Sequence, residues 1–429
     1  MRIIKTMITI GIVLSLIPTT AFAAETTTAA PISLDKMNVR SAMVIDLTSG
    51  QIIGEKNADE QVPIASQSKM LVAYGVLKQI QAGKIKWTDK VPITKYSDLH
   101  DQDAKLFSHI AMKTGDKILL RDLYNVMMTL SANDAAFALA EYITPKGQKV
   151  QTTLQDLASE LNLKGSKWYN AAGQKNSDAF ANQLANVPDT AENTASARQL
   201  GMMMWHLLNM NSRIIELDQL PNISYTMSGG YVVQEKIEHW YEVMNQMPNY
   251  SNPKKINILG GKTGSTPEAG GSFTGILEDK SGHRFLSIIN GAGDYQNKPL
   301  RYQEAINAVA LVLDQRYPHT FKSGQNLTNP AAIKLPATKQ FTLPVQVAKT
   351  KVFWTSDKDN LTTQATTSDW QPHLKSVKKN QPVATAKVNL KGAHFLNVKP
   401  AEHGQLNLSA KTSASPTNWF VKTWHQLWH

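Results

Sequence analysis

The chain has 429 residues, long enough for two domains and a sizeable hydrophobic core, and it contains no cysteine. Disulfide frameworks, thiolate nucleophiles and cysteine metal sites are therefore excluded, and we expect neither a metal nor an organic cofactor. The net charge is +11, and residues 339–429, with twelve lysines and four acidic residues, supply +8 of it. This uneven distribution favours an anionic membrane or wall polymer as a partner of the C-terminal region.

The first residues predict export. A basic start precedes an apolar run over residues 8–17, and Ala21-Phe22-Ala23 has the small-residue pattern of a signal-peptide cleavage site. The run is too short to span a membrane. We therefore expect residues 1–23 to be removed and the mature protein to be extracytoplasmic, where nucleic acid is not an expected partner. Residues 24–35 are rich in Thr, Ala and Pro and are predicted to be a flexible lead-in.

Two strands, Ser41–Asp46 and Gln51–Lys56, are predicted to lead into a helix that begins at Pro63. Ser66 and Lys69 lie one turn apart on that helix, so a hydroxyl and an amine share a face. A lysine can activate a serine only where burial and nearby charge lower the pKa of the amine.

Spacing alone does not single out this pair, because Ser-x-x-Lys occurs four times. Only one copy opens an amphipathic helix, whose dipole favours a developing alkoxide. The four copies begin at Ser33, Ser66, Ser251 and Ser376. The setting therefore selects Ser66 and Lys69.

Two later segments offer the groups that a Ser–Lys pair lacks. Helices at 119–130 and 135–142 are predicted to meet at Ser131-x-Asn133, which supplies a second hydroxyl and an amide. The plainer interpretation of this cluster is a helix cap. Residues 151–215 are predicted to be mostly helical, with a polar interruption at 171–193 that is a candidate for the border of a cleft.

A strand over Ile256–Ser265 carries Lys262-Thr263-Gly264 between further glycines, where a strand can approach a ligand closely. A lysine with a neighbouring hydroxyl suits a substrate carboxylate. Strands at 272–277 and 285–290 are predicted to follow as a hairpin.

In this order, the three motifs Ser66-x-x-Lys69, Ser131-x-Asn133 and Lys262-Thr263-Gly264 resemble those of the serine penicillin-recognising enzymes. The flanking stretches narrow the resemblance to the low-molecular-weight D-alanyl-D-alanine carboxypeptidases (peptidase S11 type), over residues 36–315. These stretches are Val44–Asp46, Lys56–Ala58, Pro63–Ala65 and Glu268–Gly270. The resemblance implies an α/β (α+β) fold, with a β-lactamase/transpeptidase-like catalytic domain and a small all-β C-terminal domain.

It also implies an activity, namely removal of the terminal D-alanine from peptidoglycan pentapeptide stems through a Ser66 acyl-enzyme. Such an enzyme takes part in cell-wall synthesis or remodelling and in the control of cell shape, and it is acylated by β-lactams. Lys69 is then the base and Ser131 the proton relay, while the backbone N–H groups of Ser66 and Ser265 form the oxyanion hole. The expected substrate-binding residues are Asn133, Lys262, Thr263, Gly264, Ser265 and Arg301. The plainer interpretation of Arg301 is a surface residue at a helix start.

The predicted domain order is catalytic domain 36–322, linker 323–338, β-rich domain 339–412 and terminal helix 417–429. Strands are expected at 341–347, 351–354, 383–390, 394–398 and 405–408, forming a small β-sandwich. The terminal helix gathers Trp419, Phe420, Trp424, Leu427 and Trp428 on one side. It is predicted to lie in the outer face of the cytoplasmic membrane, although packing against the protein is the alternative.

Two other functions remain open from the sequence. A class A β-lactamase shares the three motifs, but its E-x-x-L-N pattern requires a glutamate where this chain has Ala158. A non-catalytic wall-binding protein on the same fold is the second alternative, and a complete motif set argues against it.

Overall fold

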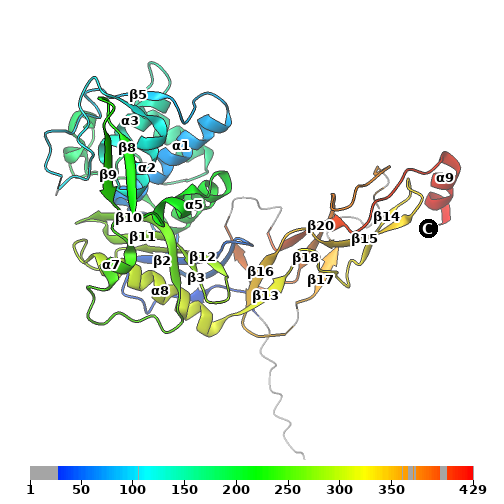
Figure 1. The fold of residues 1–429 in the computed structure, drawn as a ribbon. Coiled ribbons are helices and arrows are strands. Elements are labelled where there is room, and N and C mark those ends of the chain that lie inside the picture. The colour runs from blue at the N-terminus through cyan, green and yellow to red at the C-terminus, as the bar shows by residue number, and fades with distance from the viewer. Residues whose placement is uncertain are drawn as a thin grey trace, which may run out of the picture.

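The structure is a computed structural model that describes residues 28–104, 106–359, 361–365, 371, 373–396 and 403–428. The predicted leader, residues 1–23, lies outside the described residues. Figure 1 shows a large α/β part, residues 28–316, and a slender arm formed by residues 317–428. The C-terminal helix lies at the far end of the arm.

One mixed sheet organises the large part, in the order β1-β3-β2-β12-β11-β10. Only the short β1 runs parallel to its neighbour β3, and the other pairs are antiparallel. The bounds are β1 Ile32–Ser33, β2 Ser41–Asp46, β3 Gln51–Lys56, β10 Asn257–Thr266, β11 Gly270–Glu278 and β12 Arg284–Asn290. All five strands predicted for this region are confirmed.

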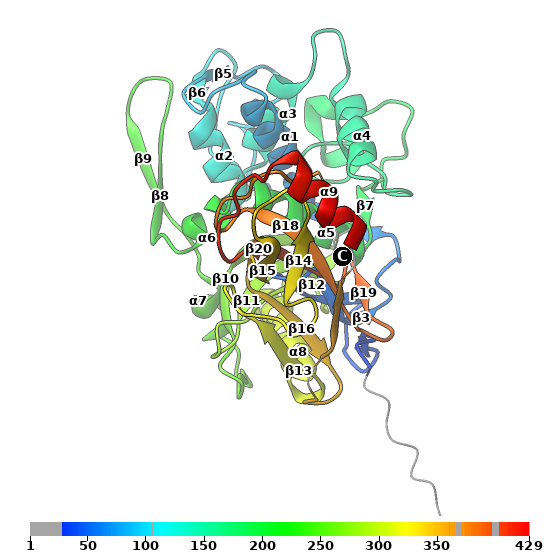
Figure 2. The ribbon, with the colours of Figure 1, turned by 90° about the vertical axis from the view of Figure 1, so that its right-hand side faces the viewer.

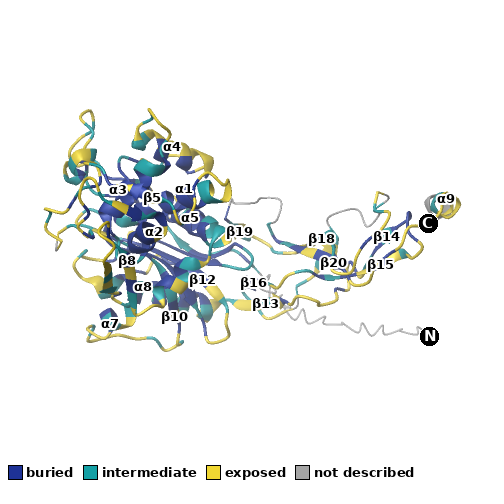
Figure 3. Cartoon of the chain, turned by 45° about the horizontal axis from the view of Figure 1, so that its top comes forward, coloured by how far each residue is buried: buried dark blue, intermediate teal, exposed yellow. Residues whose placement is uncertain are grey.

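Helices cover both faces of this sheet, which explains why its central strands are apolar nearly throughout. Ile45, Ile276 and Ile288 share a core with α5 (Ala197–Met210) on one face. The alternate side chains, such as Phe285 and Ile289, pack on the other face against α8 (Lys298–Gln315). Figure 3 shows the resulting continuous buried layer through the large part.

The predicted helix from Pro63 is wrong at its start. Val62–Pro63 forms β4, Ala65–Ser68 forms a 3-10 turn (η1), and the α-helix α1 runs only from Lys69 to Gln81. Ala65 has a φ of 45°, which a right-handed helix cannot include. The chain therefore turns sharply just before Ser66.

The other elements of the large part are short helices and strand pairs. The predicted helices at 119–130 and 135–142 are confirmed as α2 and α3. The bounds are α2 Leu120–Thr129, α3 Asn133–Ile143, α4 Val150–Glu160, α6 Arg213–Asp218, α7 Trp240–Met244, η2 Asn176–Asp178 and η3 Phe180–Asn182. Short strand pairs are β5 Lys90–Pro92 with β6 Lys117–Leu119, β8 Asn222–Thr226 with β9 Val232–Lys236, and β4 with β7 Thr194–Ala195.

The arm contains a five-stranded sheet in the order β14-β15-β20-β18-β17, and β13 pairs with β16. The bounds are β13 Tyr317–Phe321, β14 Ala332–Leu335, β15 Phe341–Val347, β16 Lys351–Thr355, β17 Thr363–Ala365, β18 Pro382–Val388 and β20 Gln405–Ala410. The predicted linker 323–338 thus contains a strand, because Ile333 and Leu335 are buried in the arm's core. The short β17 was not predicted.

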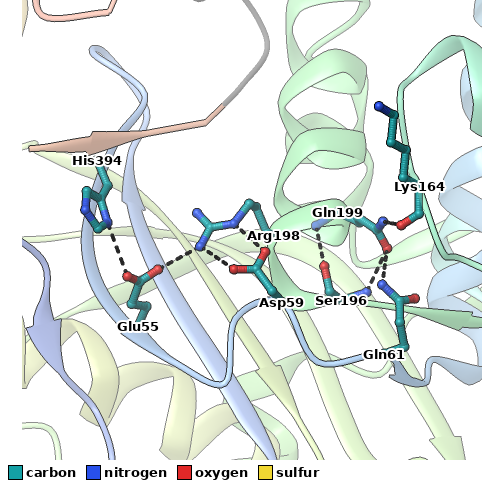
Figure 4. A network of polar contacts seen from close by, with 8 residues as sticks. All are labelled: Glu55, Asp59, Gln61, Lys164, Ser196, Arg198, Gln199 and His394. Atoms are coloured by element: carbon teal, nitrogen blue, oxygen red, sulfur yellow. Dashed lines mark hydrogen bonds and ion pairs between the residues drawn. The ribbon is translucent and has the colours of Figure 1, made fainter.

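A second correction concerns β19 (His394–Phe395), which was predicted to belong to the β-rich domain. It pairs instead with Gln51 and Ile52 of β3, at the edge of the catalytic sheet. Figure 4 shows how this junction continues through side chains: Glu55 of β3 lies between His394, at 3.4 Å, and Arg198 of α5, at 3.0 Å. The edge is therefore held by both pairing and charge.

The strand β16 fixes the arm to the large part. Trp354 is completely buried, and its ring lies 5.3 Å from that of Phe285. Its indole N–H donates to Asp46 Oδ2 at 3.0 Å, and its backbone N–H and C=O both bond to the Gln51 amide at 2.8 Å. The arm is thus docked through a buried aromatic side chain rather than through a loose linker.

At the far end, α9 (Trp419–Trp428) projects from the arm (Figures 1 and 2). Trp419 is 69% exposed and Phe420 76%. Within the described ranges, no helix is long and apolar enough to cross a membrane. The chain's H-x-x-x-H spacing, His425 to His429, falls on side chains outside the described part.

Candidate active site

The predicted nucleophile and base meet as expected. Ser66 lies in η1 and Lys69 opens α1, and Lys69 Nζ is 2.8 Å from Ser66 Oγ. The same amine also lies 2.8 Å from Asn133 Oδ1 and 3.0 Å from the backbone carbonyl of Ala172. Three oxygens therefore fix the amine beside the serine hydroxyl.

The environment of Lys69 satisfies the condition that its chemistry requires. Its side chain is fully buried, and this burial holds the pKa of the amine well below its ordinary value. The positive charge of Lys262 lowers the pKa further, while Asp134 opposes the shift. A neutral amine in contact with a serine hydroxyl can accept its proton.

Ser131 and Asn133 face the same centre. Ser131 has a φ of 59°, an uncommon conformation that the chain adopts between α2 and α3. The side chain of Asn133, the first residue of α3, contacts Lys69 rather than capping the helix. The helix-cap interpretation of this cluster is therefore wrong for Asn133.

Strand β10 forms the opposite wall. Lys262 Nζ lies 3.0 Å from Ser131 Oγ, and its burial lowers the pKa of the amine to about 7, against the opposing charge of Asp218. Strand β10 can pack directly against the segment that precedes Ser66 because Gly264 has no side chain. A Cβ at Gly264 would lie 2.6 Å from the backbone oxygen of Ile64.

The remaining predicted residues lie along one cleft of about 920 Å³. Arg301, on α8, is 6% exposed, and its Nη1 donates to Ser265 Oγ at 2.6 Å. The plainer interpretation of Arg301 as a surface residue is wrong. The cleft lining includes Ser66, Ser131, Asn133, Lys262, Thr263, Ser265 and Arg301.

Two features of the site were not predicted. Asp218, at the end of α6, accepts from the Gly261 N–H at 2.7 Å, and burial raises its pKa to about 7. Segment 171–193, which was predicted only as a candidate for the border of a cleft, also contributes directly to the surroundings of Lys69 and Ser66. Ala172 supplies an acceptor to Lys69, and a Cβ at Gly173 would lie only 1.9 Å from the Ala65 oxygen.

Position 158, where a class A β-lactamase would need its glutamate, lies outside the cleft. Ala158 is buried in α4, and the neighbouring Glu160 contacts Tyr74 and Lys78. Neither residue lines the cleft. The described part of the chain likewise contains no group of three or more His, Asp or Glu side chains that could hold a metal ion.

Together, these groups place a serine hydroxyl beside a buried lysine amine, a second hydroxyl beside Lys262, and the cationic side chains of Lys262 and Arg301 along the same cleft. Such a set is suited to acyl transfer from a substrate that carries a carboxylate.

Comparison with known proteins agrees with this chemistry. The profile of a protein family described as D-alanyl-D-alanine carboxypeptidase (Peptidase S11) matches residues 24–293. D-alanyl-D-alanine carboxypeptidase DacC from Escherichia coli K12 is 26% identical over 278 residues, which cover 64% of this chain and 60% of DacC. The match thus spans less than two thirds of that relative.

Solved structures share the fold over more of the chain. A peptidoglycan synthesis regulatory factor (PBP3) from Streptococcus pneumoniae superposes with a TM-score of 0.73 at 18% identity, covering 88% of this chain and 99% of that one. Penicillin binding protein 5 from Haemophilus influenzae gives a TM-score of 0.61 at 17% identity, covering 89% and 98%. These similarities confirm the predicted α/β fold and its β-rich C-terminal part.

Proposed function

Because this chain belongs to the D-alanyl-D-alanine carboxypeptidase family of serine peptidases, we propose that it removes the terminal D-alanine from peptidoglycan pentapeptide stems. The observation that carries the proposal is the fully buried Lys69 amine, 2.8 Å from Ser66 Oγ. A lysine is buried in this way at a large cost in desolvation, which a reactive role explains and a surface-binding role does not.

In the first half of the reaction, Ser66 Oγ attacks the carbonyl carbon between the two D-alanines while Lys69 takes the hydroxyl proton. The new C–O bond forms, the C–N bond breaks, and the leaving amine receives a proton through Ser131, which lies next to Lys262. In the second half, water attacks the ester, and the stem peptide leaves as a carboxylate while Ser66 regains its proton.

Binding groups around these atoms support the substrate assignment. Lys262, Thr263 and Arg301 line the cleft and provide two cations and a hydroxyl for the terminal carboxylate. Asn133 would position the peptide amide. The N–H groups of Ser66 and Ser265, on facing elements, would stabilise the oxyanion. A β-lactam, which presents a strained amide and a carboxylate, would acylate Ser66 by the same contacts.

The decisive experiment measures D-alanine release from a stem pentapeptide beside penicillin hydrolysis, with Ser66→Ala as the control. Release that disappears in the variant, with slow penicillin turnover, supports the carboxypeptidase. Rapid penicillin turnover without D-alanine release would make the protein a β-lactamase. Wall binding that persists in Ser66→Ala without either activity would support the non-catalytic alternative.

We further propose that the protein is exported and attaches to the outer face of the cytoplasmic membrane through α9. The exposed Trp419 and Phe420 support an interfacial position for this helix. Lysines also lie near the start of α9. Segment 411–417, which leads into the helix, runs beside the turn at 337–340, where Lys339 N donates to Ser415 O. It also runs beside segment 374–380, where Val377 pairs with Ala414. The exposed lysines of these segments are Lys339, Lys375, Lys378, Lys379 and Lys411. Anionic lipid headgroups complement this end of the arm.

Vesicle sedimentation tests the attachment. The protein should bind phosphatidylglycerol vesicles more strongly than phosphatidylcholine vesicles, and salt should weaken the binding. Replacing Lys339, Lys378 and Lys379 by alanine should reduce binding, whereas the matched set Lys349, Lys387 and Lys391, exposed lysines of the arm away from α9, should not. Equal effects of the two sets would remove the lysines from the proposal, and no binding to either vesicle would refute attachment itself.

A further inference from the structure

A small charged cluster connects segment 171–193 to the end of β10, and the mechanism above does not use it. Lys175 Nζ lies 2.5 Å from Glu268 Oε1, in the turn that follows β10. The Thr266 hydroxyl, at the last position of β10, donates to Glu192 Oε2 at 3.1 Å. Lys175 and Thr266 both line the active-site cleft.

Two glutamates meet inside this cluster. The carboxyl groups of Glu192 and Glu268 are hydrogen-bonding neighbours, and Glu192 is only 6% exposed. Their remaining oxygens, Glu192 Oε1 and Glu268 Oε2, are buried and find no donor among the described residues. Two carboxylates are acceptors only, whereas one proton between them satisfies both oxygens.

We propose that Glu192 and Glu268 share a single proton and that this proton holds segment 171–193 against β10, so that the pair acts as a positioning device for the active site. The inference rests on the proposed function for the reaction that it supports. Neither glutamate touches the reacting atoms, and both act through the backbone that they hold in place.

Both connected elements carry parts of the catalytic centre. Segment 171–193 provides the Ala172 carbonyl that fixes the Lys69 amine, and Gly173 packs directly on the turn before Ser66. On the other side, Ser265 precedes Thr266 and is held by Arg301. If the cluster separates, the Ala172 carbonyl, which accepts from Lys69, and the end of β10 are no longer held in place relative to each other.

The charges around the pair determine how it responds to pH. The described charged groups that face it are Lys175 and, behind that lysine, Asp178. With one shared proton the pair carries a single negative charge, which Lys175 balances; without the proton it carries two, and Asp178 adds to the repulsion.

Burial raises the pKa of Glu192 from 4.5 to about 7, and Glu268 acts in the same direction. For Glu268, contacts with Lys175 and Glu192 outweigh its own burial, so the pKa of that group is lowered. Glu192 therefore holds the shared proton. Because the pKa of Glu192 is raised in the intact cluster, the shared proton stabilises the cluster fully below pH 4.5, and this stabilisation is lost as the pH rises through about 7.

The variant Glu192→Gln tests this, because its amide can donate to Glu268 and accept from Thr266 at every pH. The rate of acylation by a fluorescent penicillin and the thermal midpoint are measured from about pH 5 to 8.5 for wild type, Glu192→Gln and Glu192→Ala. The matched control is Glu160→Gln. Glu160 is an exposed glutamate at the end of α4 that pairs with Lys78 of α1, and it does not line the cleft.

The acylation rate of Glu192→Gln relative to wild type should be near one at low pH and rise to on the order of threefold or more at high pH. Glu192→Ala should be slower than wild type wherever the proton is bound, and Glu160→Gln should show a constant ratio. Parallel pH profiles for wild type and Glu192→Gln would overturn the proposal. If the proposed activity itself fails, the thermal midpoints still report whether Glu192→Gln removes the pH dependence.

Discussion

The junction between the large part and the arm gives a stability prediction that separates two contributions of one residue. Trp354→Phe keeps an aromatic ring against Phe285 but removes the indole N–H, which among the described residues is the one donor to Asp46 Oδ2; Thr48 and Ser49 both donate to Oδ1. Asp46 is fully buried, so an unsatisfied oxygen there should lower the free energy of unfolding by about 1–3 kcal/mol.

Trp354→Ala also removes the ring from a completely buried site. The cost should then be about 3–5 kcal/mol for the lost packing, in addition to the lost hydrogen bond. Because β16 is part of the arm, the same variant should loosen the arm from the large part. The expected order of stability is therefore wild type, then Trp354→Phe, then Trp354→Ala.

Urea unfolding followed by far-UV circular dichroism measures these differences, and limited proteolysis of the folded protein reports on the arm. Trp419→Ala serves as the control, because that tryptophan is 69% exposed on α9 and its removal should leave stability unchanged. If Trp354→Ala were no less stable than Trp354→Phe, or if both matched wild type, the docking described here would be wrong.

Three further outcomes follow from the site. Lys69→Arg replaces the amine by a guanidinium that stays positively charged and cannot accept a proton. Acylation by penicillin, measured by stopped flow, should therefore fall by about 10²–10⁴-fold, and a smaller loss would argue against a base at this position. The Lys262 amine, with a pKa of about 7, is charged below that pH and neutral above it, so KM for a D-Ala-D-Ala peptide should rise as the pH passes from 6 to 8. A peptide with a blocked C-terminal carboxylate should not show this rise, and an identical rise for both peptides would refute carboxylate binding by Lys262. Gly173→Ala should slow acylation and destabilise the fold, because its Cβ would clash with the Ala65 carbonyl. The control Gly83→Ala, also at positive φ but with open space around the Cβ, should cost only about 1 kcal/mol in thermal unfolding. Equal costs for the two variants would argue against the clash.

The sequence was sufficient for those parts of the fold and site that local patterns determine. The strands at 41–46 and 285–290 follow from short, mostly apolar segments, and the contact between Ser66 and Lys69 follows from their spacing of three residues in a helical turn. Ser131 and Lys262 were recognisable because each belongs to a short motif. None of these inferences needed a tertiary contact to be known.

The parts that were missed depend on contacts between distant segments. Asp218 is an ordinary acidic residue at a helix end, and only the fold brings it to the Gly261 backbone. Glu192 likewise gains its role from meeting Glu268, which no spacing reveals. The prediction that β19 belongs to the β-rich domain failed for the same reason, since a two-residue strand has no pattern that names its partner.

The edge strand β3 also bears on how this protein folds. Its free edge is completed by β1, near the start of the described chain, and by β19, near its end. The pairing with β19 joins residues 51–52 to residues 394–395, and so distant a pairing forms late, because closing a long loop must precede any gain from the contact. Until residues 394–395 have been synthesised and have reached the sheet, part of β3 remains an unpaired edge that another chain can occupy. A shortened protein that ends before β16 would keep that exposed edge permanently and would lack the Trp354 that covers Asp46. Aggregation of such a truncated chain would then reflect an incomplete sheet rather than an unstable catalytic core.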